Sequence, residues 1–389
     1  MPRRGTSALW LIGAVLLGLV WRVAGEKNTL CYYGSWATYR PARGRFEVEN
    51  INPHLCTHLV YTFFGLHANG TIHVLDPWLD LEDNWGRGNI RRFNELKNIN
   101  PRLKTLAAIG GYNEGSEDFS KVADSADLRH VFAEDCRDFC LRHGFDGVDI
   151  DWEYPSTADR TNFVLLLADL RQVLSEAGLM LTAAVAAHVD QAAISYDIPS
   201  ISVLLDHINL MAYDFNGAWN SVTGHNAPLF AGPADVTDFQ RTLNVDYSVR
   251  YWLGQGAPAF KMNVGVAFYG RTFTLANTAL SGLQAPAIGP GLAGPYSRQE
   301  GWLAYFEICT NFPINDWIRH WDNDQRIPFG VMGDQWIGYD DVESVQQKCD
   351  YIYQHNLGGA MVWSIDQDDF HGYCGVQYPL LWTLERCFN

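Results

Sequence analysis

The sequence predicts an α/β protein, a closed (β/α)8 barrel with an inserted α+β subdomain. Eight short runs rich in β-branched and aromatic residues alternate with helical patterns along the 389 residues. Such barrels take about 250 residues plus insertions, so the length is sufficient. The one long interruption, residues 269–338, lies between the seventh strand and its helix and is rich in Gly, Pro and aromatic residues. We expect it to form a wall beside the barrel mouth.

Each strand is short and bounded by a helical pattern or a turn, as the barrel requires. The eight expected strands are residues 30–36, 58–64, 103–109, 147–152, 181–187, 207–213, 262–268 and 359–364. In this fold the active site lies at the C-terminal ends of the strands. Functional side chains are therefore expected where these runs end.

Apolar residues between the strands recur at helical spacing. One helix is expected before Gly144, a second before Gly178 and a third just before the eighth strand. Their apolar positions are Leu128, Val131, Phe132, Cys136, Phe139 and Cys140; Phe163, Leu166, Leu167, Leu170, Val173 and Leu174; and Val342, Val345, Cys349 and Ile352.

Residues 1–25 have the pattern of a secretory signal peptide. Arg3 and Arg4 precede an apolar run over residues 8–20, and small residues follow at 23–25. The alternative is an N-terminal membrane anchor, but the run is shorter than the ~20 residues of a membrane span. We expect a secreted chain whose catalytic barrel covers residues 26–389, without membrane association.

The charge balance excludes one class of partner. Loss of residues 1–25 leaves 25 basic against 44 acidic residues, a formal net charge of −19 in place of −16. Nucleic acid is therefore not an expected partner, because phosphate binding requires the opposite sign. An uncharged or cationic substrate is compatible with this charge.

Cysteines and one sequon fit a secreted chain. Eight cysteines suggest disulfides, although eight allow 105 pairings. Asn69 begins an Asn-Gly-Thr sequon, which is either a glycosylation site or simply a turn.

The fourth strand carries an unusual row of acids. Alternate side chains of a strand face the same way, so Asp149, Asp151 and Glu153 share one face, opposite Val148, Ile150 and Trp152. Asp146 is out of phase and is expected to begin the strand and brace it.

Stacked carboxylates inside a barrel repel one another, so some of their pKa values should be raised and at least one proton held. Glu153, last in the row, is placed to act as a general acid at the barrel mouth. The alternative is a buried structural ion cluster, which would need cations, and no Lys or Arg lies within the strand.

The row Asp146-Gly-Val-Asp149-Ile-Asp151-Trp-Glu153 resembles the DxxDxDxE signature of family 18 glycoside hydrolases, the chitinases and their lectin relatives. The resemblance covers nearly the whole mature chain and is closest to secreted animal chitinases, especially those of arthropods. It is carried by CYYGSWATYRP at the first strand, AAIGGYNEGS at the third, NLMAYDFNGAW at the sixth, FYGRTFTL after the seventh and GGAMVWSIDQDDFHG at the eighth.

The resemblance assigns roles to the acids. It implies that Glu153 protonates the glycosidic oxygen, that Asp151 orients the substrate acetamide, and that Asp149 shares a proton with Asp151. Tyr213 would hydrogen-bond the acetamide oxygen, with Met211 and Asp214 in the same subsite. Without the acids, the MAYDF segment would fit a buried strand end equally well.

Aromatic residues are the expected sugar-binding groups, because an aromatic face packs on the apolar side of a pyranose. The resemblance places Trp363 under the sugar at the cleavage site. The further candidates for substrate binding are Trp36, Tyr39, Trp78, Trp219, Tyr61, Phe63, Gly110 and Gly111. Most of the fourteen tryptophans should instead belong to the core.

Arg271 matches a cleft arginine of the family, and a structural salt bridge is the alternative. Two positions depart from the family pattern. Tyr112 stands where relatives usually have Trp, and Gln299 where many have Glu. Both concern substrate affinity away from the cleavage point.

The resemblance also implies the disulfides Cys31 with Cys56 and Cys309 with Cys374, and Cys349 is within expected reach of Cys387. Cys136 and Cys140 lie four apart on a core-facing helix, where an intrahelical bridge and two buried thiols are both open. A metal site is disfavoured because no His completes it.

The resemblance thus implies a secreted, monomeric, metal-independent and cofactor-independent endo-chitinase that cleaves β-1,4-linked N-acetylglucosamine polymers or oligomers with retention. A chitin-binding lectin or growth-factor-like protein is the main alternative, since fold does not decide function. Non-catalytic relatives usually lose an acid of the row, whereas all are present here. An endo-N-acetylglucosaminidase acting on glycoproteins fits the aromatic cleft less well.

Overall fold

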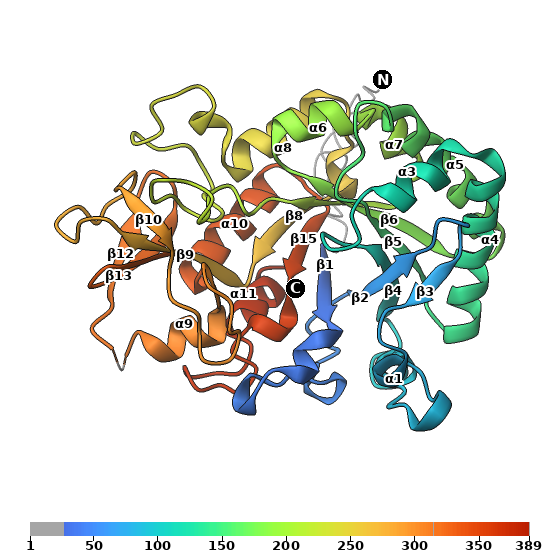
Figure 1. The fold of residues 1–389 in the computed structure, drawn as a ribbon, viewed down its shortest axis with the longest axis horizontal. Coiled ribbons are helices and arrows are strands. Elements are labelled where there is room, and N and C mark those ends of the chain that lie inside the picture. The colour runs from blue at the N-terminus through green and yellow to red at the C-terminus, as the bar shows by residue number, and fades with distance from the viewer. Residues whose placement is uncertain (1–26, 314, 389) are drawn as a thin grey trace, which may run out of the picture.

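A computed structural model describes residues 27–313 and 315–388. Eight parallel strands form a ring in the order β1-β15-β8-β7-β6-β5-β4-β2, and β1 pairs with β2 to close it. The predicted (β/α)8 barrel is therefore confirmed (Figure 1). The strands are β1 (Asn28–Gly34), β2 (His58–Leu66), β4 (Lys104–Gly110), β5 (Gly147–Asp151), β6 (Met180–Ala186), β7 (His207–Met211), β8 (Met262–Ala267) and β15 (Gly359–Trp363).

Several strands end earlier than the sequence pattern suggests. The apolar run of β1 continues to Trp36, but the strand ends at Gly34 and the 3-10 helix η1 (Ser35–Tyr39) follows. Likewise β5 ends at Asp151 and β7 at Met211. Glu153 and Tyr213 therefore lie just beyond their strands, in the loops of the barrel mouth.

Helices surround the barrel. They are α2 (Asn89–Glu95), α3 (Glu117–Asp124), α4 (Ala126–His143), α5 (Arg160–Glu176), α6 (Val189–Ser195), α7 (Ile198–Leu204), α8 (Val245–Gly254), α10 (Val342–Gln354) and α11 (Pro379–Phe388). The helix α4 begins at its N-cap Ser125 and ends where Gly144 adopts φ 80°. Val131 on α4 was expected in the core but is exposed.

The first strand differs from the simple repeat. Instead of an α-helix, β1 is followed by η1 and two further 3-10 helices, η2 (Ala42–Gly44) and η3 (Val48–Asn50). Pro41 lies directly between η1 and η2 and lacks the N–H that a continuing helix would need. The segment that follows β1 therefore forms short 3-10 helices in place of an α-helix.

A second, antiparallel sheet forms the inserted subdomain between β8 and α10. Its order is β10-β9-β14-β13-β12, with β11 paired to β9. The strands are β9 (Tyr269–Leu275), β10 (Ala287–Pro290), β11 (Trp302–Ala304), β12 (Ile318–Asp322), β13 (Ile327–Met332) and β14 (Gln335–Gly338), and the helix is α9 (Tyr305–Asn311). Figure 1 shows this sheet in orange at one side of the barrel, as the sequence predicts.

The alternation along β5 sets up two separate cores. Val148, Ile150 and Trp152 are buried in the large cluster between barrel and helices, as predicted. Asp149 and Asp151 point the other way, into the barrel. The described interior of the barrel contains a smaller cluster that includes Leu30, Tyr32, Val60, Leu106, Ala108 and Met361.

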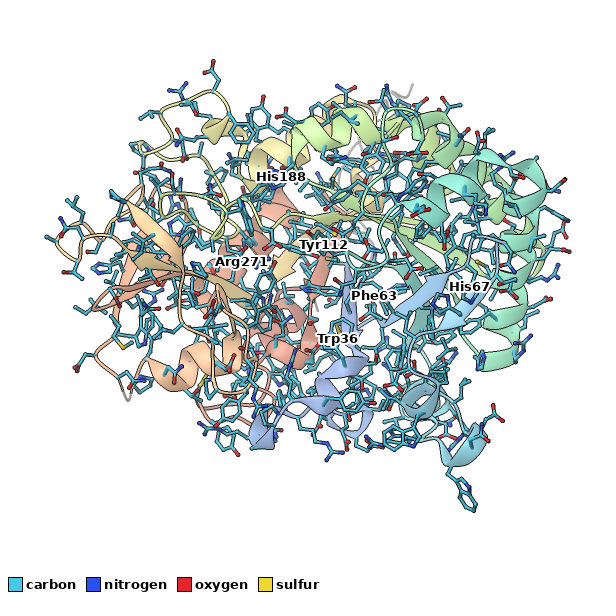
Figure 2. The ribbon with its side chains drawn as sticks, viewed as in Figure 1. Trp36, Phe63, His67, Tyr112, His188 and Arg271 are labelled. Atoms are coloured by element: carbon cyan, nitrogen blue, oxygen red, sulfur yellow. A yellow bond between two sulfur atoms is a disulfide. The ribbon has the colours of Figure 1, made fainter. Side chains whose placement is uncertain are left out.

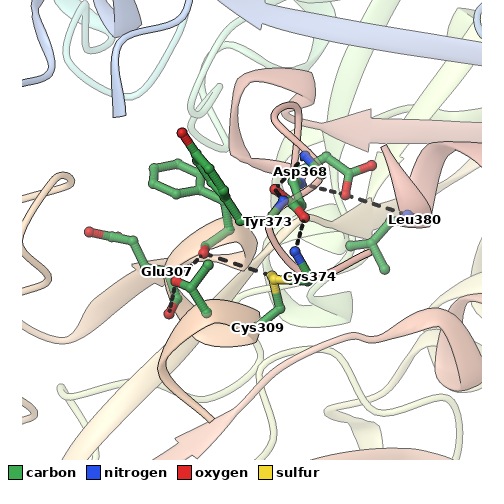
Figure 3. Close-up of a disulfide and its surroundings, with 10 residues drawn as sticks. Glu307, Cys309, Asp368, Tyr373, Cys374 and Leu380 are labelled. Atoms are coloured by element: carbon green, nitrogen blue, oxygen red, sulfur yellow. Dashed lines mark hydrogen bonds between the residues drawn. A yellow bond between two sulfur atoms is a disulfide. The ribbon is translucent and has the colours of Figure 1, made fainter. Parts of the chain in front are cut away.

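Three disulfides occur in the described residues, joining Cys31 to Cys56, Cys309 to Cys374 and Cys349 to Cys387. The second ties α9 of the insertion to the loop after β15 (Figure 3). Cys136 and Cys140 are free and buried, which answers the question left open by their spacing. Burial raises the pKa of both thiols, so neither is a reactive thiolate.

The proposed signal peptide, residues 1–25, lies outside the described residues. Among the described helices, none is long and apolar enough to cross a membrane. Asn69 is exposed at the turn between β2 and the short strand β3 (Ile72–Val74), where its side chain accepts a hydrogen bond from the Thr71 hydroxyl at 2.7 Å. Its glycosylation remains a prediction.

Candidate active site

Asp149 is held at the centre of the barrel by three other strands, β6 beside it, β7 next in the ring and β1 across the barrel. It is fully buried, and it accepts hydrogen bonds from Tyr32 of β1 (2.7 Å), Thr182 of β6 and Asn209 of β7 (3.1 Å). Burial raises the pKa of Asp149, and these three donors oppose the rise. Because every partner donates, Asp149 needs no proton to satisfy these contacts.

Asp151, two residues further along the same face, lacks such partners. It is 3% exposed, and its Oδ1 has no hydrogen-bond partner among the described residues. Burial and the charges of Glu153 and Asp149 raise the pKa of Asp151 well above its ordinary value. A buried acceptor without a partner is unfavourable, so this oxygen is suited to receive a donor from a bound molecule.

Glu153 ends the row at the barrel mouth. Burial, together with the charge of Asp214, raises the pKa of Glu153 to about 7, although a hydrogen bond with Tyr154 opposes the shift. Glu153 therefore keeps its proton at mildly acidic pH while remaining partly accessible. A carboxyl group in this condition can act as a general acid.

Residues after β7 and in β9 form the facing wall. Arg271 donates two hydrogen bonds of 2.7 Å to the two oxygens of Asp214, and Tyr269 donates a third of 2.7 Å. Asp214 adopts the left-handed φ of 57°. The salt bridge that was the alternative role for Arg271 is thus present. It holds the Asp214 carboxylate where the negative charge of Asp214 raises the pKa of Glu153.

Tyr213 and Met211 lie beside this pair. The Tyr213 side chain is 7% exposed, and its hydroxyl lies 3.5 Å from the sulfur of Met361. Met211 is half-buried against the inner cluster. Trp219, in contrast, is exposed and packs its ring 5.1 Å from the Arg271 guanidinium (Figure 2 labels Arg271).

Three aromatic rings, Trp36 of η1, Phe63 of β2 and Trp363 of β15, stack at the mouth. The Phe63 centroid lies 5.7 Å from Trp363 and 5.9 Å from Trp36, and both pairs are nearly parallel. Figure 2 shows Trp36 and Phe63 near the middle of the molecule, with Tyr112 close by. Trp363 is partly exposed, so part of its ring is accessible to a ligand.

Gly110 and Gly111 allow the third barrel strand to end close to these groups. A Cβ on Gly110 would lie 2.1 Å from the Asp151 carbonyl oxygen, and one on Gly111 would lie 2.7 Å from the Phe63 ring. Both have positive φ, 115° and 88°. No larger residue would fit without moving the acid strand or the aromatic stack.

A cavity of about 490 Å³ continues from the aromatic stack. Its lining includes Trp36, Tyr39, Phe63, Gly110 and Tyr112, all of which the sequence indicated. It also includes residues that the sequence reasoning missed, namely Ser35, Leu75, Asp76, Leu79, Asp80, Asn113 and Glu114. The acidic and aromatic segment at residues 75–80 was the available signal.

Three expected site residues, Tyr61, Gln299 and Trp78, lie away from the mouth or at its edge. Tyr61 is fully buried between barrel and helices and donates to Asp80, so it can affect a ligand only through that carboxylate. Gln299 is exposed in the loop between β10 and β11. Trp78 is 53% exposed on α1 (Pro77–Asp80), next to the cavity.

Asp146 is a brace at the opposite end of β5. It pairs with Lys97 at 2.9 Å and Lys104 at 3.3 Å, and accepts from the Thr105 backbone N–H at 2.9 Å. These contacts lower the pKa of Asp146. The expected structural role therefore agrees with its position.

A buried acid row, a glutamic acid with a raised pKa and stacked aromatic rings lie together at the mouth of a (β/α)8 barrel, an arrangement typical of the glycosidase class of protein. The family model for glycosyl hydrolases family 18 matches residues 28–368. The chain belongs to this family.

Similar proteins of known structure or sequence are chitinases and chitinase-like proteins. "Probable chitinase 2" of Drosophila melanogaster is 40% identical over 95% of this chain and 77% of its own length. The Group IV chitinase of Ostrinia furnacalis, solved with allosamidin, is 44% identical with a TM-score of 0.90 over 92% of this chain and 98% of that one.

Human YKL-39, described as a pseudo-chitinase that retains chitooligosaccharide binding, is also similar. It is 38% identical with a TM-score of 0.86, covering 93% of this chain and 99% of its own. The family therefore contains both hydrolases and binding proteins on one fold.

Proposed function

We propose that this protein is a secreted, monomeric chitinase that hydrolyses β-1,4-linked N-acetylglucosamine chains with retention of configuration. The observation that carries the proposal is the pairing of Asp151 with Glu153. Asp151 offers a buried oxygen that has no partner among residues 27–313 and 315–388, and Glu153 keeps a proton up to a pH of about 7. Sugar hydrolysis needs an acid, and the acetamide needs an acceptor for its N–H.

In the proposed reaction Glu153 donates its proton to the glycosidic oxygen as that bond breaks. The substrate's own acetamide oxygen attacks the anomeric carbon, forming a cyclic oxazolinium ion, as in other substrate-assisted enzymes of this family. Asp151 passes its proton to Asp149, accepts from the acetamide N–H and, as a carboxylate, balances the positive charge. The Tyr213 hydroxyl donates to the acetamide oxygen. Glu153 then takes a proton from a water molecule. The oxygen of that water attacks the anomeric carbon and opens the oxazolinium ring.

The remaining residues bind the sugar. Trp363, Trp36 and Phe63 supply stacking faces for pyranose rings. Asp214, fixed by Arg271, and Met211 complete the subsite around the acetamide. Tyr39, Gly110, Gly111 and Tyr112 border the adjoining cavity, and Trp78, Trp219 and Gln299 lie further out. The chemistry assigned to these side chains involves no cofactor or metal ion.

Binding without hydrolysis is the second candidate, because YKL-39 is so described. The complete row of Asp149, Asp151 and Glu153 favours hydrolysis. A cleavage assay separates the two.

The proposed mechanism predicts a dependence on the N-acetyl group. Acetylated chitin oligomers should be cut to products that first appear as the β anomer, as chromatography of early products can establish. Fully deacetylated chitosan and cellulose oligomers should remain uncut, because they lack the internal nucleophile. Efficient cleavage of the deacetylated polymer would contradict the mechanism, and binding of acetylated oligomers without any cleavage would favour the second candidate.

The pH dependence follows from the raised pKa of Glu153. Cleavage should decline as the pH rises through about 7, because Glu153 loses the proton that it must donate.

Asp149→Asn removes a negative charge that raises the pKa of Asp151, so the coupled acids Asp151 and Glu153 should release their proton at lower pH. The alkaline limb of a kcat/KM profile should move down in pH. An unchanged limb in a folded variant would show that the acids do not titrate together.

A further inference from the structure

Asp214 has a backbone conformation that must be held by its surroundings. Its φ of 57° lies in the left-handed region, which is uncommon for residues other than Gly, although Asp tolerates it better than most. The negative charge of Asp214 acts on Glu153, so the path of this backbone decides where that charge lies. The contacts that hold Asp214 therefore bear on the acid of the candidate active site.

Asn226 holds the N-terminal side of Asp214. The Asp214 backbone N–H donates to the Asn226 Oδ1 at 3.0 Å, and the Phe215 backbone N–H donates to the Asn226 carbonyl oxygen at 3.0 Å. Asn226 is fully buried, and its Nδ2 donates to the Tyr269 carbonyl oxygen at 3.2 Å. Because the Tyr269 hydroxyl donates to the Asp214 carboxylate, these contacts form a closed ring of three residues.

His188 holds the C-terminal side of Asp214. It is the N-cap residue of α6, two residues past the end of β6, and Figure 2 labels it. Its Nε2 lies 3.2 Å from the Asp214 carbonyl oxygen, and since a carbonyl oxygen only accepts, Nε2 must carry the hydrogen. The ring also packs 5.1 Å from that of Phe215. Two side chains from different loops thus fix the peptide groups on either side of the left-handed residue.

The other titratable groups around Glu153 and Asp214 leave this position of Asp214 decisive. They are Asp151 of β5, Tyr154 beside Glu153, His188 before α6, Tyr196 after it, Tyr213 after β7, and Tyr269 and Arg271 of β9. Burial raises the pKa of all four tyrosines, so their hydroxyls stay neutral while Glu153 titrates. Asp151 belongs to the acid row itself. Asp214 is the carboxylate outside the row whose charge raises the pKa of Glu153.

We propose that His188 and Asn226 are positioning residues, which hold the left-handed backbone of Asp214 and so keep its carboxylate where it acts on Glu153. The proposal rests on the proposed function, because Glu153 is the acid of that reaction. Neither side chain belongs to the acid row, and both act through Asp214.

The test measures the pKa of Glu153 and the alkaline limb of kcat/KM in His188→Phe and His188→Gln. Phenylalanine keeps a ring against Phe215 but has no donor, whereas glutamine carries an Nε2–H that can reach the same carbonyl. In His188→Phe both values should fall by roughly 0.3 to 1 pH unit, a part of the shift that one nearby charge produces. His188→Gln should restore most of this loss.

The sign of the shift separates positioning from a direct effect of charge. If His188 acted mainly as a positive charge, its loss would raise the pKa of Glu153. A rise in His188→Phe would therefore overturn the proposal.

A second variant, Asn226→Ala, removes the side-chain contacts with the Asp214 N–H and the Tyr269 carbonyl. It should lower the pKa of Glu153 at least as far as His188→Phe does, in protein whose cooperative melting shows that it is folded. Asn226 is buried, so the partly exposed His188 carries the test if Asn226→Ala does not fold.

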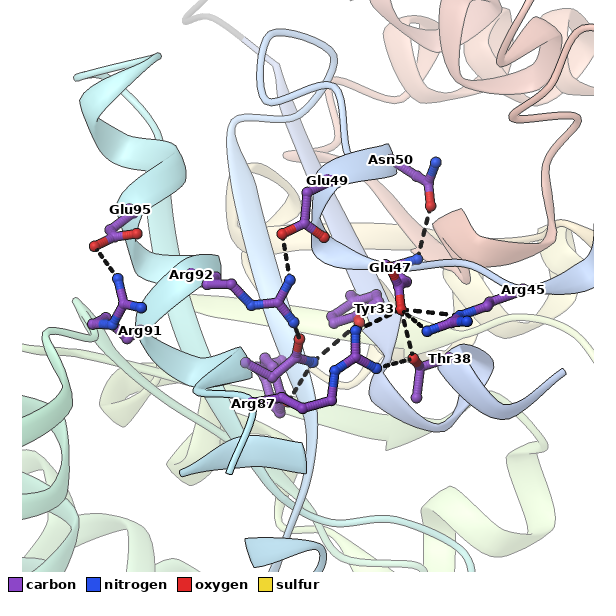
Figure 4. A network of polar contacts seen from close by, with 12 residues as sticks. Tyr33, Thr38, Arg45, Glu47, Glu49, Asn50, Arg87, Arg91, Arg92 and Glu95 are labelled. Carbon is purple, nitrogen blue, oxygen red and sulfur yellow. Dashed lines mark hydrogen bonds and ion pairs between the residues drawn. The ribbon is translucent and has the colours of Figure 1, made fainter. Parts of the chain in front are cut away.

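Two controls alter polar side chains elsewhere. His130→Phe makes the same replacement at an exposed position of α4. Arg91→Gln breaks the surface pairs with Glu82 and Glu95, the second of which Figure 4 shows. Neither control should move the alkaline limb.

The pKa of Glu153 is read from a carbon-13 NMR titration of protein labelled at its glutamate carboxyl groups, with the Glu153 signal assigned by its absence from Glu153→Gln. An unchanged pKa in folded His188→Phe would overturn the proposal, as would a fall of equal size in His188→Gln. Weaker oligosaccharide binding with an unmoved limb would also overturn it and assign His188 to the sugar. If the wild-type chain cleaves nothing but this pKa falls in His188→Phe, the proposed hydrolysis fails and the positioning role stands.

Discussion

Glu153→Gln should lower the rate of chitin-oligomer hydrolysis by at least ~10²–10⁴, the usual contribution of one acid–base group. The glutamine has almost the same shape but holds no transferable proton. Oligosaccharide binding should persist, because the aromatic stack and Asp151 are untouched. Turnover of soluble oligomers and calorimetric binding would measure the two effects separately.

A matched control is Glu117→Gln on α3, where the carboxylate is exposed in the first helical turn. It should keep full activity. Near wild-type turnover in Glu153→Gln would remove this residue from the mechanism, whichever other acid then took its place.

Asp151→Asn should produce the second large loss, roughly 10² or more in kcat, because positioning of the acetamide and balance of the intermediate's charge both depend on this carboxylate. The asparagine side chain has almost the same shape as aspartate, so it fills the same buried volume. Binding of the unreacted oligomer should change less than kcat, since the charge develops only during the reaction.

The measurement for Asp151→Asn is single-turnover kinetics beside the binding constant. A loss confined to binding would mean that Asp151 contributes equally to the bound substrate and the transition state. A covalent sugar ester trapped on Asp151 in the wild-type chain would show that the enzyme itself supplies the nucleophile.

Much of the site could be predicted because its residues are adjacent in the chain. Asp149, Asp151 and Glu153 share a face through the period of two along one strand, which needs no tertiary information. The same alternation placed Val148, Ile150 and Trp152 against the helices. The barrel followed from the number and order of the strands, and the insertion from its length and composition.

Other parts depended on contacts between distant segments. Tyr61 belongs to a strand that contributes Phe63 to the mouth, yet it is buried on the outer side of the barrel and bonded to Asp80. Alternation would place Tyr61 and Phe63 on one face, but the register of β2 against β4 shifts between Tyr61 and Phe64. Neither this irregularity nor the partner in α1 that buries the Tyr61 hydroxyl is visible in the sequence. The cavity lining from residues 75–80 and 113–114 likewise appears only when two loops meet.

By itself the sequence determined the barrel, the inserted subdomain, the acid row and the family, because strand period, helical period and local motif are properties of neighbouring residues. Only the tertiary structure decided which acid keeps its proton and which oxygen lacks a partner. Those properties arise from burial and from charges such as Asp214, fixed by Arg271 from a strand of the insertion. The free state of the buried Cys136 and Cys140 was decided in the same way, because burial depends on the whole fold.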